Sequence, residues 1–409
     1  MHRTGYLFSM ATMGLLLFVV DWYTVQGVRT LVYGSESDGG GILGVGLGVV
    51  LLVVTLGMFA GVAFIRRNGT TPPIVRIVLH TFLILFVAQL VLMTVLFTED
   101  IFRVLVAALT DSGIPDRSRL VSQVGVTLAA LPMLALIYGV ARGRHDYRVH
   151  RHTIWFDDLP PAFDGFRITQ VSDIHAGSLR NQKAVERAID LIRAEKSDLF
   201  VFTGDLVNNR ADEIEPWIRS FSRIDAPFGK YAVLGNHDYG DYIAWNSLAE
   251  KQANLQRLAS HHVAMGHRLL MNENARIEKD GSFITLIGIE NWGHGFSQYG
   301  NLQRALEGVD PGSFKVLLSH DPSHWAAEVR DHNQHIHLTL AGHTHGMQFG
   351  IELGRVRWSP VKYRYSHWAG LTGKDNQYLH INRGFGVLGY EGRFGIWPEI
   401  TVIELRRRS

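Results

Sequence analysis

An apolar stretch without a single charge constrains the fold of this chain most strongly. Ile42–Ile65 contains no charged residue and is long enough to cross a lipid bilayer as a helix. Ile77–Phe97 and Val121–Ala141 are nearly as apolar. We therefore predict that residues 1–144 form an all-α transmembrane domain with four helices, whose spans lie near residues 5–27, 42–65, 77–97 and 121–141.

The first of these stretches allows two interpretations. It begins at Gly5 and contains Asp21, and a cleaved signal peptide is one alternative. It lacks the small residues of a cleavage site and further spans follow it, which favours a transmembrane helix. Asp21 directly precedes Trp22 and Tyr23, a pair typical of the headgroup region. We therefore favour a boundary residue over a functional carboxylate inside the membrane.

Loop arginines predict the orientation. Arg66, Arg67 and Arg76 lie between the second and third spans, and several arginines follow the fourth span. The loops after the first and third spans carry acidic residues beside their arginines. Because cytoplasmic loops are enriched in Lys and Arg, we expect a multi-pass inner-membrane protein with both termini in the cytoplasm.

Composition excludes some classes of protein. The formal net charge of +2 is close to neutral, so we expect no nucleic-acid partner. The chain has no cysteine, which excludes disulfides and iron–sulfur clusters but leaves the compartment open. The composition does not indicate an oligomeric state.

The pattern changes near residue 145, where we expect a linker over residues 145–165 and a soluble domain over residues 166–409. Phe166–Val171 and Leu199–Thr203 are predicted to be buried strands, and Lys183–Ala194 between them has the spacing of an amphipathic helix. This alternation favours a layered α/β fold. Further strands are predicted at Lys230–Leu234, Phe283–Ile289, Phe314–Leu318, His337–Ala341, Tyr378–Asn382 and Thr401–Leu405.

Polar segments follow five of these strands. In an open α/β sheet, the loops that leave the carboxyl ends of strands converge on one crevice. Each segment alone has a simpler explanation as a turn or a helix cap. Together they provide the oxygen and nitrogen donors that a metal site needs. The segments are Asp173-Ile-His175, Gly204-Asp205, Gly235-Asn236-His237-Asp238, Ser319-His320 and Gly342-His343-Thr-His345.

With these motifs, residues 150–405 resemble a calcineurin-like metallophosphoesterase. The later segments Asn382-Arg383-Gly384-Phe385-Gly386 and Pro398-Glu399-Ile400, with Arg393 between them, are similar to one bacterial branch of that family. The wider family includes a membrane-associated UDP-diacylglucosamine pyrophosphatase. The resemblance implies a four-layer α-β-β-α sandwich. The transmembrane extension is not among the shared motifs.

The resemblance also implies a pair of metal ions and the residues that hold them. Two divalent ions about 3.5–4 Å apart, of Mn, Fe, Zn or Mg, would share a hydroxide that attacks phosphorus. Asp205 would bridge them. His237 would donate a proton to the leaving group or hold a phosphoryl oxygen. The first ion is expected on Asp173, His175 and His345, and the second on Asn236, His320 and His343.

One position departs from the family pattern. Many relatives carry an aspartate three residues after the bridging one, where this chain has Asn208. An amide cannot stabilise an imidazolium as a carboxylate does. Either Asp238 or another acid replaces that carboxylate, which makes Asp238 a candidate catalytic residue beside His237, or His237 stays neutral and works mainly as a hydrogen-bond donor. Arg383 and Arg180 are candidate substrate residues, because arginine binds diphosphate bidentately.

The expected activity is hydrolysis of a phosphodiester or pyrophosphate bond in a phosphorylated small molecule or lipid, by an enzyme in contact with the lipid bilayer. One alternative is a phosphatase for a soluble phosphomonoester, cyclic nucleotide or phosphoprotein. A second alternative is a membrane sensor or scaffold without turnover.

Overall fold

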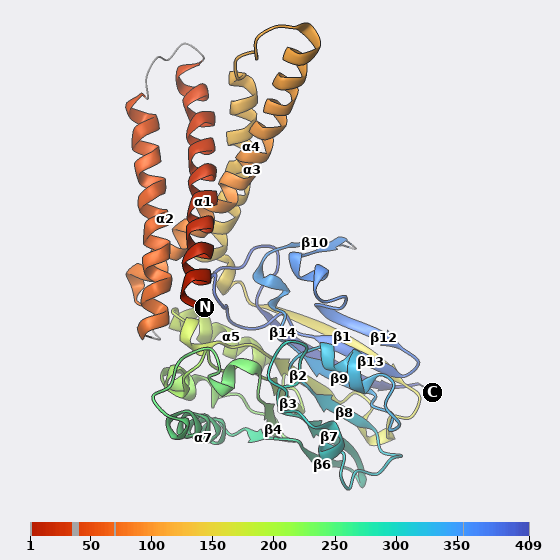
Figure 1. The fold of residues 1–409 in the computed structure, drawn as a ribbon. Coiled ribbons are helices and arrows are strands. Elements are labelled where there is room, and N and C mark those ends of the chain that lie inside the picture. The colour runs from red at the N-terminus through yellow and green to blue at the C-terminus, as the bar shows by residue number, and fades with distance from the viewer. Residues whose placement is uncertain (1, 35–40, 69–70, 355, 409) are drawn as a thin grey trace. The chain divides into compact units, whose positions relative to one another are not determined.

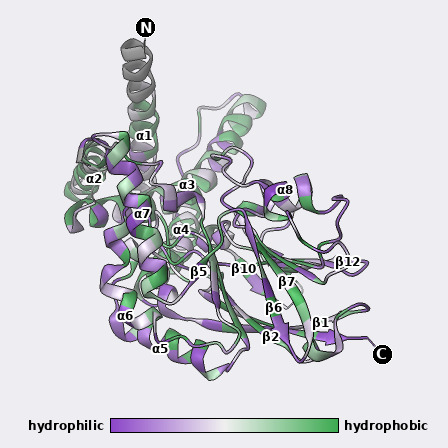
Figure 2. Ribbon diagram, turned by 90° about the horizontal axis from the view of Figure 1, so that it is seen from below, coloured by the Kyte–Doolittle hydropathy of each residue, from purple (hydrophilic) through white to green (hydrophobic). Residues whose placement is uncertain are grey.

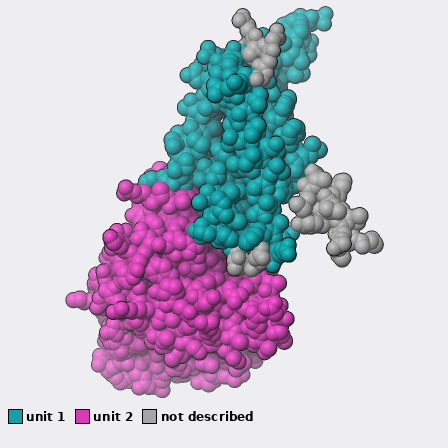
Figure 3. All heavy atoms as spheres, turned by 90° about the vertical axis from the view of Figure 1, so that its left-hand side faces the viewer, with its two compact units in different colours: residues 1–138 teal, residues 139–409 magenta. Residues whose placement is uncertain are grey.

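The computed structural model describes residues 2–34, 41–68, 71–354 and 356–408. The chain divides into two compact units, residues 1–138 and residues 139–409, which Figure 3 colours separately.

Unit 1 consists of long apolar helices. They are α1 (His2–Tyr33), α2 (Ile42–Asn68), α3 (Pro73–Thr110) and α4 (Arg119–Ala141). Four helices, over Thr12–Tyr33, Ile42–Arg67, Pro73–Thr110 and Arg119–His145, are long and apolar enough to cross a membrane. Most of the exposed large hydrophobic side chains of the chain lie on them, and they are largely green in Figure 2. The protein is therefore a multi-pass membrane protein, as the hydropathy pattern predicts.

Helix α3 is longer than the predicted span. It continues through Thr110, although we expected a loop from Thr98. Its polar residues after that point are paired: Asp100 accepts hydrogen bonds from Arg117 at 2.6 Å and 2.7 Å, and Arg103 donates to Asp100 at 2.6 Å. These pairs explain how the helix continues past the apolar stretch.

Asp21 lies inside α1 and not at its boundary. Its carboxylate accepts a hydrogen bond of 2.7 Å from Gln89 on α3 and one of 3.2 Å from Thr55 on α2. An ionisable group in a span is normally paired in this way with polar groups of neighbouring helices. Asp21 therefore joins three helices of unit 1.

Unit 2 contains two six-stranded sheets (Figure 1). The first has the order β1-β14-β2-β3-β4-β5, in which β2 to β5 are parallel. Its strands are β1 (Arg148–Phe156), β14 (Glu399–Arg407), β2 (Arg167–Val171), β3 (Leu199–Thr203), β4 (Lys230–Val233) and β5 (Arg268–Leu269).

The second sheet has the order β12-β13-β9-β8-β7-β6, with parallel central strands and antiparallel edges. Its strands are β12 (Gly370–Lys374), β13 (Gln377–Ile381), β9 (Leu338–Ala341), β8 (Lys315–Leu318), β7 (Ser282–Gly288) and β6 (Glu273–Lys279). A separate hairpin consists of β10 (Ile351–Leu353) and β11 (Val356–Trp358).

The side chains of each strand alternate between the two faces of its sheet, and this alternation builds the layers. Leu199 and Val201 of β3 belong to the core between the two sheets, which also includes Leu286 of β7 and Val316 of β8. Phe200 and its neighbours on the other face pack against helices, because successive side chains of a strand point to opposite faces. These helices are α5 (Gln182–Ala194), α6 (Ile218–Phe221) and α7 (Leu248–Ala264).

The outer face of the second sheet is covered by short α8 (Leu302–Ala305) and a helical turn at Trp325–Val329. The predicted four-layer α-β-β-α sandwich is therefore present. Residues 148–156 differ from the prediction, because they form β1 where we expected a linker. The first half of this edge strand, Arg-Val-His-Arg-His, is mostly polar, and all nine residues of the strand pair with β14, which is distant in sequence.

Candidate metal centre

Two groups of donor side chains lie at the carboxyl ends of the central strands. The ligand atoms of Asp173, His175 and His345 lie within 4.8 Å of one another, as do those of a second group. The second group consists of Asp205, His320 and His343. The chain segments that carry them follow β2, β3, β8 and β9. The structure thus brings six of the seven predicted ligands together in the two predicted sets.

Asp205 connects the two groups. Its Oδ2 lies 3.5 Å from Nε2 of His175 in the first group and 3.2 Å from Nε2 of His320 in the second. Its Oδ1 accepts a hydrogen bond of 2.8 Å from the backbone N–H of His237. This is the position of the bridging ligand that the resemblance implies.

Asn236, the seventh predicted ligand, has an unsatisfied oxygen. The side chain is only 4% exposed, and its Nδ2 donates a hydrogen bond of 2.7 Å to the hydroxyl of Tyr242. Its Oδ1 is buried and has no hydrogen-bond partner among the described residues. A buried amide oxygen without a partner is costly, and a cation removes that cost. The residues present therefore fit a metal ion.

Hydrogen bonds orient two of the histidine rings. Nδ1 of His320 lies 2.7 Å from the carbonyl oxygen of Thr203, and Nδ1 of His175 lies 3.1 Å from Oδ1 of Asn208. Because both oxygens accept, each Nδ1 carries a hydrogen, and Nε2 is the nitrogen of each ring that faces the centre. Metal-ligating histidines are normally fixed by such an acceptor.

Several ring nitrogens face one another. Nε2 of His175 lies 3.0 Å from Nε2 of His345, and Nδ1 of His343 lies 3.2 Å from Nε2 of His320. Each distance fits an N–H···N hydrogen bond between the two rings, and a bound cation would replace the shared hydrogen. The nitrogen positions thus agree with bound cations.

The backbone at the centre is strained. Asp173, His175, Asp205, His343 and His345 all have positive φ angles, between 44° and 69°. This region is uncommon for residues other than glycine, and such outliers cluster at functional sites. The positive φ angles direct these short loops so that the side chains converge.

Two motif glycines leave room for the ligands. A Cβ atom on Gly342 would lie 2.3 Å from Oδ2 of Asp173, and one on Gly235 would lie 2.2 Å from Oδ1 of Asp205. Any larger residue at either position would displace a carboxylate of the centre. These contacts explain why both segments begin with glycine.

Burial and the shared carboxylate shift the pKa values in opposite directions. Burial lowers the pKa of His175 to about 3 and that of His343 to about 4, so both rings are neutral and able to bind a metal. Burial raises the pKa of Asp173 to about 6. For His320 burial acts in the same direction as for the other rings, but the charge of Asp205 outweighs it and raises the pKa of His320 to about 10.

His237 is held by a backbone carbonyl. Its Nδ1 lies 2.8 Å from the carbonyl oxygen of Asn208, which leaves Nε2 for a substrate. The side chain of Asn208 contacts His175 and donates to Ser178 at 3.2 Å. The amide therefore orients a candidate metal ligand, and the backbone carbonyl of the same residue holds His237.

Asp238 has a positioning role, in contrast to the predicted catalytic one. Its Oδ1 accepts hydrogen bonds from the backbone N–H groups of Leu206 at 2.8 Å and Val207 at 3.2 Å. Its Oδ2 accepts from those of Asp205 and Gly235, both at 2.9 Å. Within the described chain, no hydrogen bond joins this carboxylate to the ring of the preceding histidine. Asp238 ties the loop after β3 to the loop after β4.

Arg383 differs from its predicted role in substrate binding. It is 2% exposed, and its guanidinium forms ion pairs with Glu399 and, at 2.6 Å, with Glu352. A buried arginine that is held by two carboxylates is a structural group. The sequence alone could not reveal these partners, because neither glutamate is its neighbour along the chain.

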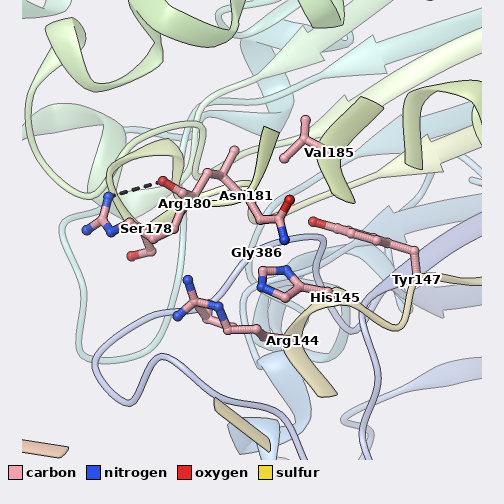
Figure 4. A pocket seen from close by; sticks show the side chains of 10 residues that line it. Arg144, His145, Tyr147, Ser178, Arg180, Asn181, Val185 and Gly386 are labelled. Atoms are coloured by element: carbon pink, nitrogen blue, oxygen red, sulfur yellow. Dashed lines mark hydrogen bonds between the residues drawn. The ribbon is translucent and has the colours of Figure 1, made fainter. Parts of the chain in front are cut away.

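Arg180 lies at the edge of a small cavity, together with Arg144, His145 and Asn181 (Figure 4). Its Nη1 donates to the carbonyl oxygen of Leu179 at 3.1 Å, which is the dashed line in Figure 4. Its side chain is 40% exposed and lies 3.4 Å from the carboxylate of Glu391. Its role in substrate binding stays a prediction.

The sequence analysis assigned no role at the centre to three residues that lie beside it. Asp321, which is fully buried, lies 3.4 Å from Nε2 of His343. Tyr242 contacts Asn236, and Nη2 of Arg393 lies 3.2 Å from Nδ1 of His345. Asp321 directly follows the Ser-His segment, and this adjacency was the one sequence feature that could have identified Asp321.

Comparison with known proteins agrees with this geometry. Residues 166–347 match the family described as calcineurin-like phosphoesterase. Residues 6–144 match a family described as probable calcineurin-like phosphoesterase, transmembrane domain, which includes the first apolar stretch. β1 lies between the two matched ranges. A fold with two sheets and such a donor set defines a metal-dependent phosphoesterase.

Similar proteins come from several organisms. The chain is 31% identical to the uncharacterized metallophosphoesterase YkuE of Bacillus subtilis, over 66% of this chain and 90% of that protein. It is 26% identical to a Danio rerio transmembrane protein with metallophosphoesterase domain, over 69% of this chain and 63% of that protein. It is 25% identical to the UDP-2,3-diacylglucosamine pyrophosphatase LpxG of Chlamydia trachomatis, over 68% of this chain and 94% of that protein. The protein belongs to the calcineurin-like phosphoesterase family and is a phosphate ester hydrolase.

Metal affinity is expected to rise with pH. Below its raised pKa, His320 of the metal-free protein carries a proton that an arriving cation must displace. One displaced proton makes the affinity for Mn²⁺ rise by about tenfold per pH unit at neutral pH. Calorimetric titration in buffers of different ionisation enthalpy measures the released proton. A pH-independent affinity would contradict the assignment of His320 as a ligand.

Replacing Asp238 is expected to destabilise the protein. In the wild type, the carboxylate of Asp238 accepts hydrogen bonds from buried backbone N–H groups. In Asp238→Asn, an NH₂ group faces these donors and cannot accept from them. We therefore expect the free energy of unfolding of unit 2 to fall by about 2–4 kcal/mol. Chemical denaturation measures this loss. The exposed Asp212→Asn is the control, for which we expect no change. Equal stabilities of the two variants would refute the positioning role.

Proposed function

We propose that this protein is a dimetal phosphoesterase that hydrolyses a phosphodiester or pyrophosphate bond of a lipid-linked substrate. The unsatisfied Oδ1 of Asn236 is the observation that carries this proposal. It adds an oxygen donor to the group around His320 and His343, and this donor has no partner among the described residues. Asp173, His175 and His345 would hold one divalent ion. Asn236, His320 and His343 would hold the other, and Asp205 would contact both.

Bound ions would polarise the phosphate and favour deprotonation of a water molecule. The chain's own residues do the rest. The backbone N–H of His237 holds the bridging carboxylate, and Asn208 and Thr203 keep the lone pairs of two histidines directed at the centre. Nε2 of His237 is free to hold a phosphoryl oxygen or to protonate the leaving group.

The lipid-linked substrate is supported by two observations. The chain continues directly from membrane helix α4 to the catalytic unit, so the centre stays tethered to the bilayer where such substrates are concentrated. The relative LpxG, which aligns over 94% of its length, is described as a pyrophosphatase for a diacylated nucleotide sugar. We assign manganese as the first ion to test, because oxygen and imidazole ligands suit it.

An exposed arginine near His343, Arg364, supports a substrate that contains a diphosphate. The guanidinium of Arg364 lies 5.5 Å from the ring centre of Phe296 and 5.7 Å from that of Tyr365. Both rings lie against His343, with centres 4.7 Å and 5.8 Å from its own. Arg364 is therefore one layer of side chains away from a candidate ligand, and we assign it to the second phosphate of the substrate.

A substrate panel tests the reaction. With Mn²⁺, the full-length protein should cleave bis-nitrophenyl phosphate and a UDP-linked diacyl glycolipid faster than mononitrophenyl phosphate. Asn236→Ala should lower kcat about 100-fold, because it removes an oxygen donor of the centre. Preference for the monoester would establish the soluble phosphatase alternative. Absence of turnover with bound Mn²⁺ would favour a sensor.

Arg364→Gln is expected to affect diphosphate substrates alone. Loss of a charge-assisted contact should raise KM for the UDP-linked glycolipid about tenfold and leave bis-nitrophenyl phosphate unchanged. Arg357→Gln is the matched control, since Arg357 is exposed and pairs with Glu352. An equal effect on both substrates would place Arg364 outside the recognition of the second phosphate.

The orientation is a further part of the proposal, with the catalytic unit in the cytoplasm of an inner membrane. Arg66, Arg67 and Arg76 near the ends of α2 and α3 support it. A green fluorescent protein fused to the C-terminus should fluoresce, and an alkaline phosphatase fused there should be inactive. The reverse pattern would place the centre outside the cytoplasm.

A further inference from the structure

A second cluster of cationic side chains lies in unit 1, far along the chain from the metal centre. Trp22, Gln26, Arg29 and Thr30 on α1 line a cavity of about 320 Å³. Their spacing places them on one face of the helix. The remaining lining residues are Gly34, Arg103, Asp116 and Arg117, from the end of α1, the last turns of α3 and the connection to α4.

The guanidinium groups in this cavity, which we call the basic pocket, have different environments. Arg117 is saturated, because it donates to both carboxylate oxygens of Asp100, to Glu99 and to the carbonyl oxygen of Leu96. Arg103 donates through Nε to the carbonyl oxygen of Pro115 at 2.6 Å and through Nη1 to Asp100. These contacts fix both groups at the wall of the pocket and leave Nη2 of Arg103 for a ligand.

Arg29 has no ion pair among the described residues. Its Nε is buried and has no hydrogen-bond partner in that part of the chain. A buried guanidinium N–H without an acceptor is costly, and an anion in the pocket would satisfy it. Among the eight described residues that line the pocket, three are arginines and Asp116 is the one acidic residue. The lining therefore favours an anion.

The position of the basic pocket along the helix bundle indicates which anion it binds. It lies where α1 and α3 end and α4 begins, so the C-terminal end of α4 is at the other end of the bundle. Arg29 and Arg103 lie near the ends of α1 and α3, and arginine side chains near helix ends extend to the headgroup region of a bilayer. Phosphate is the anion of that region, and arginine binds it through paired N–H groups.

We propose that the basic pocket binds a phosphate group at the membrane interface, with Arg29 and Nη2 of Arg103 as its donors. Gln26 is beside Arg29 on the same helix face and is able to donate its amide N–H. The phosphate belongs either to an anionic lipid headgroup or to a soluble phosphate. In the orientation proposed above, the pocket lies at the non-cytoplasmic side of the membrane. It is independent of the metal centre and of the proposed reaction.

Lipid binding to the full-length protein in detergent tests this proposal. Native mass spectrometry should detect phosphatidylglycerol bound with higher affinity than phosphatidylcholine. Arg29→Gln should weaken phosphatidylglycerol binding about tenfold, because a charge-assisted contact is lost. Since Arg29 has no ion pair within the described part of the chain, this variant should fold as the wild type does, and its melting temperature without ligand checks this. Arg67→Gln, an exposed arginine at the other end of α2, is the matched control.

A second arm distinguishes the source of the phosphate. If the ligand is soluble, inorganic phosphate should raise the melting temperature of the wild type and of Arg67→Gln but not that of Arg29→Gln. Either selective effect of Arg29→Gln supports the pocket. Equal binding by the wild type and Arg29→Gln in both arms would overturn the proposal. An equal loss in Arg67→Gln would also overturn it, because the effect would then be one of net charge.

Discussion

The carboxylate of Asp205 is the contact on which the candidate centre depends. It lies within 3.5 Å of a histidine from each of the two donor groups, and these histidines come from the two different sheets. Without a cation, the buried carboxylates and the facing ring nitrogens have too few compensating charges. The centre therefore couples the two halves of the sandwich. Asp238 supports this arrangement, because it holds the loop that carries Asp205 through backbone N–H groups.

Much of the site could be predicted from sequence, because its ligands follow strands that hydrophobic runs identify. β3, for example, has the predicted bounds of Leu199–Thr203. The contacts of individual polar side chains could not be predicted. Arg383 was assigned to the substrate, but its partners Glu352 and Glu399 are brought to it by the fold alone. Likewise, the first half of β1 is mostly polar and shows no apolar run, and only its pairing with β14 identifies it as a strand.

In the membrane unit, too, the contacts of individual polar side chains could not be predicted from sequence. Hydropathy predicts the four helices, since a bilayer imposes length and composition on each. It does not predict where the polar residues inside them find partners. Asp21 is bonded to α2 and α3, and Asp100 fixes two arginines at the wall of the basic pocket. Polar residues of unit 1 therefore have structural roles that hydropathy cannot assign.

The most direct test of the central claim is the electron paramagnetic resonance spectrum of the full-length protein loaded with Mn²⁺. Two ions that share the carboxylate of Asp205 should be magnetically coupled, and metal analysis should find two ions per chain. Asp205→Asn should abolish the coupling. A spectrum of isolated ions in the wild type, or coupling that survives in Asp205→Asn, would contradict the account.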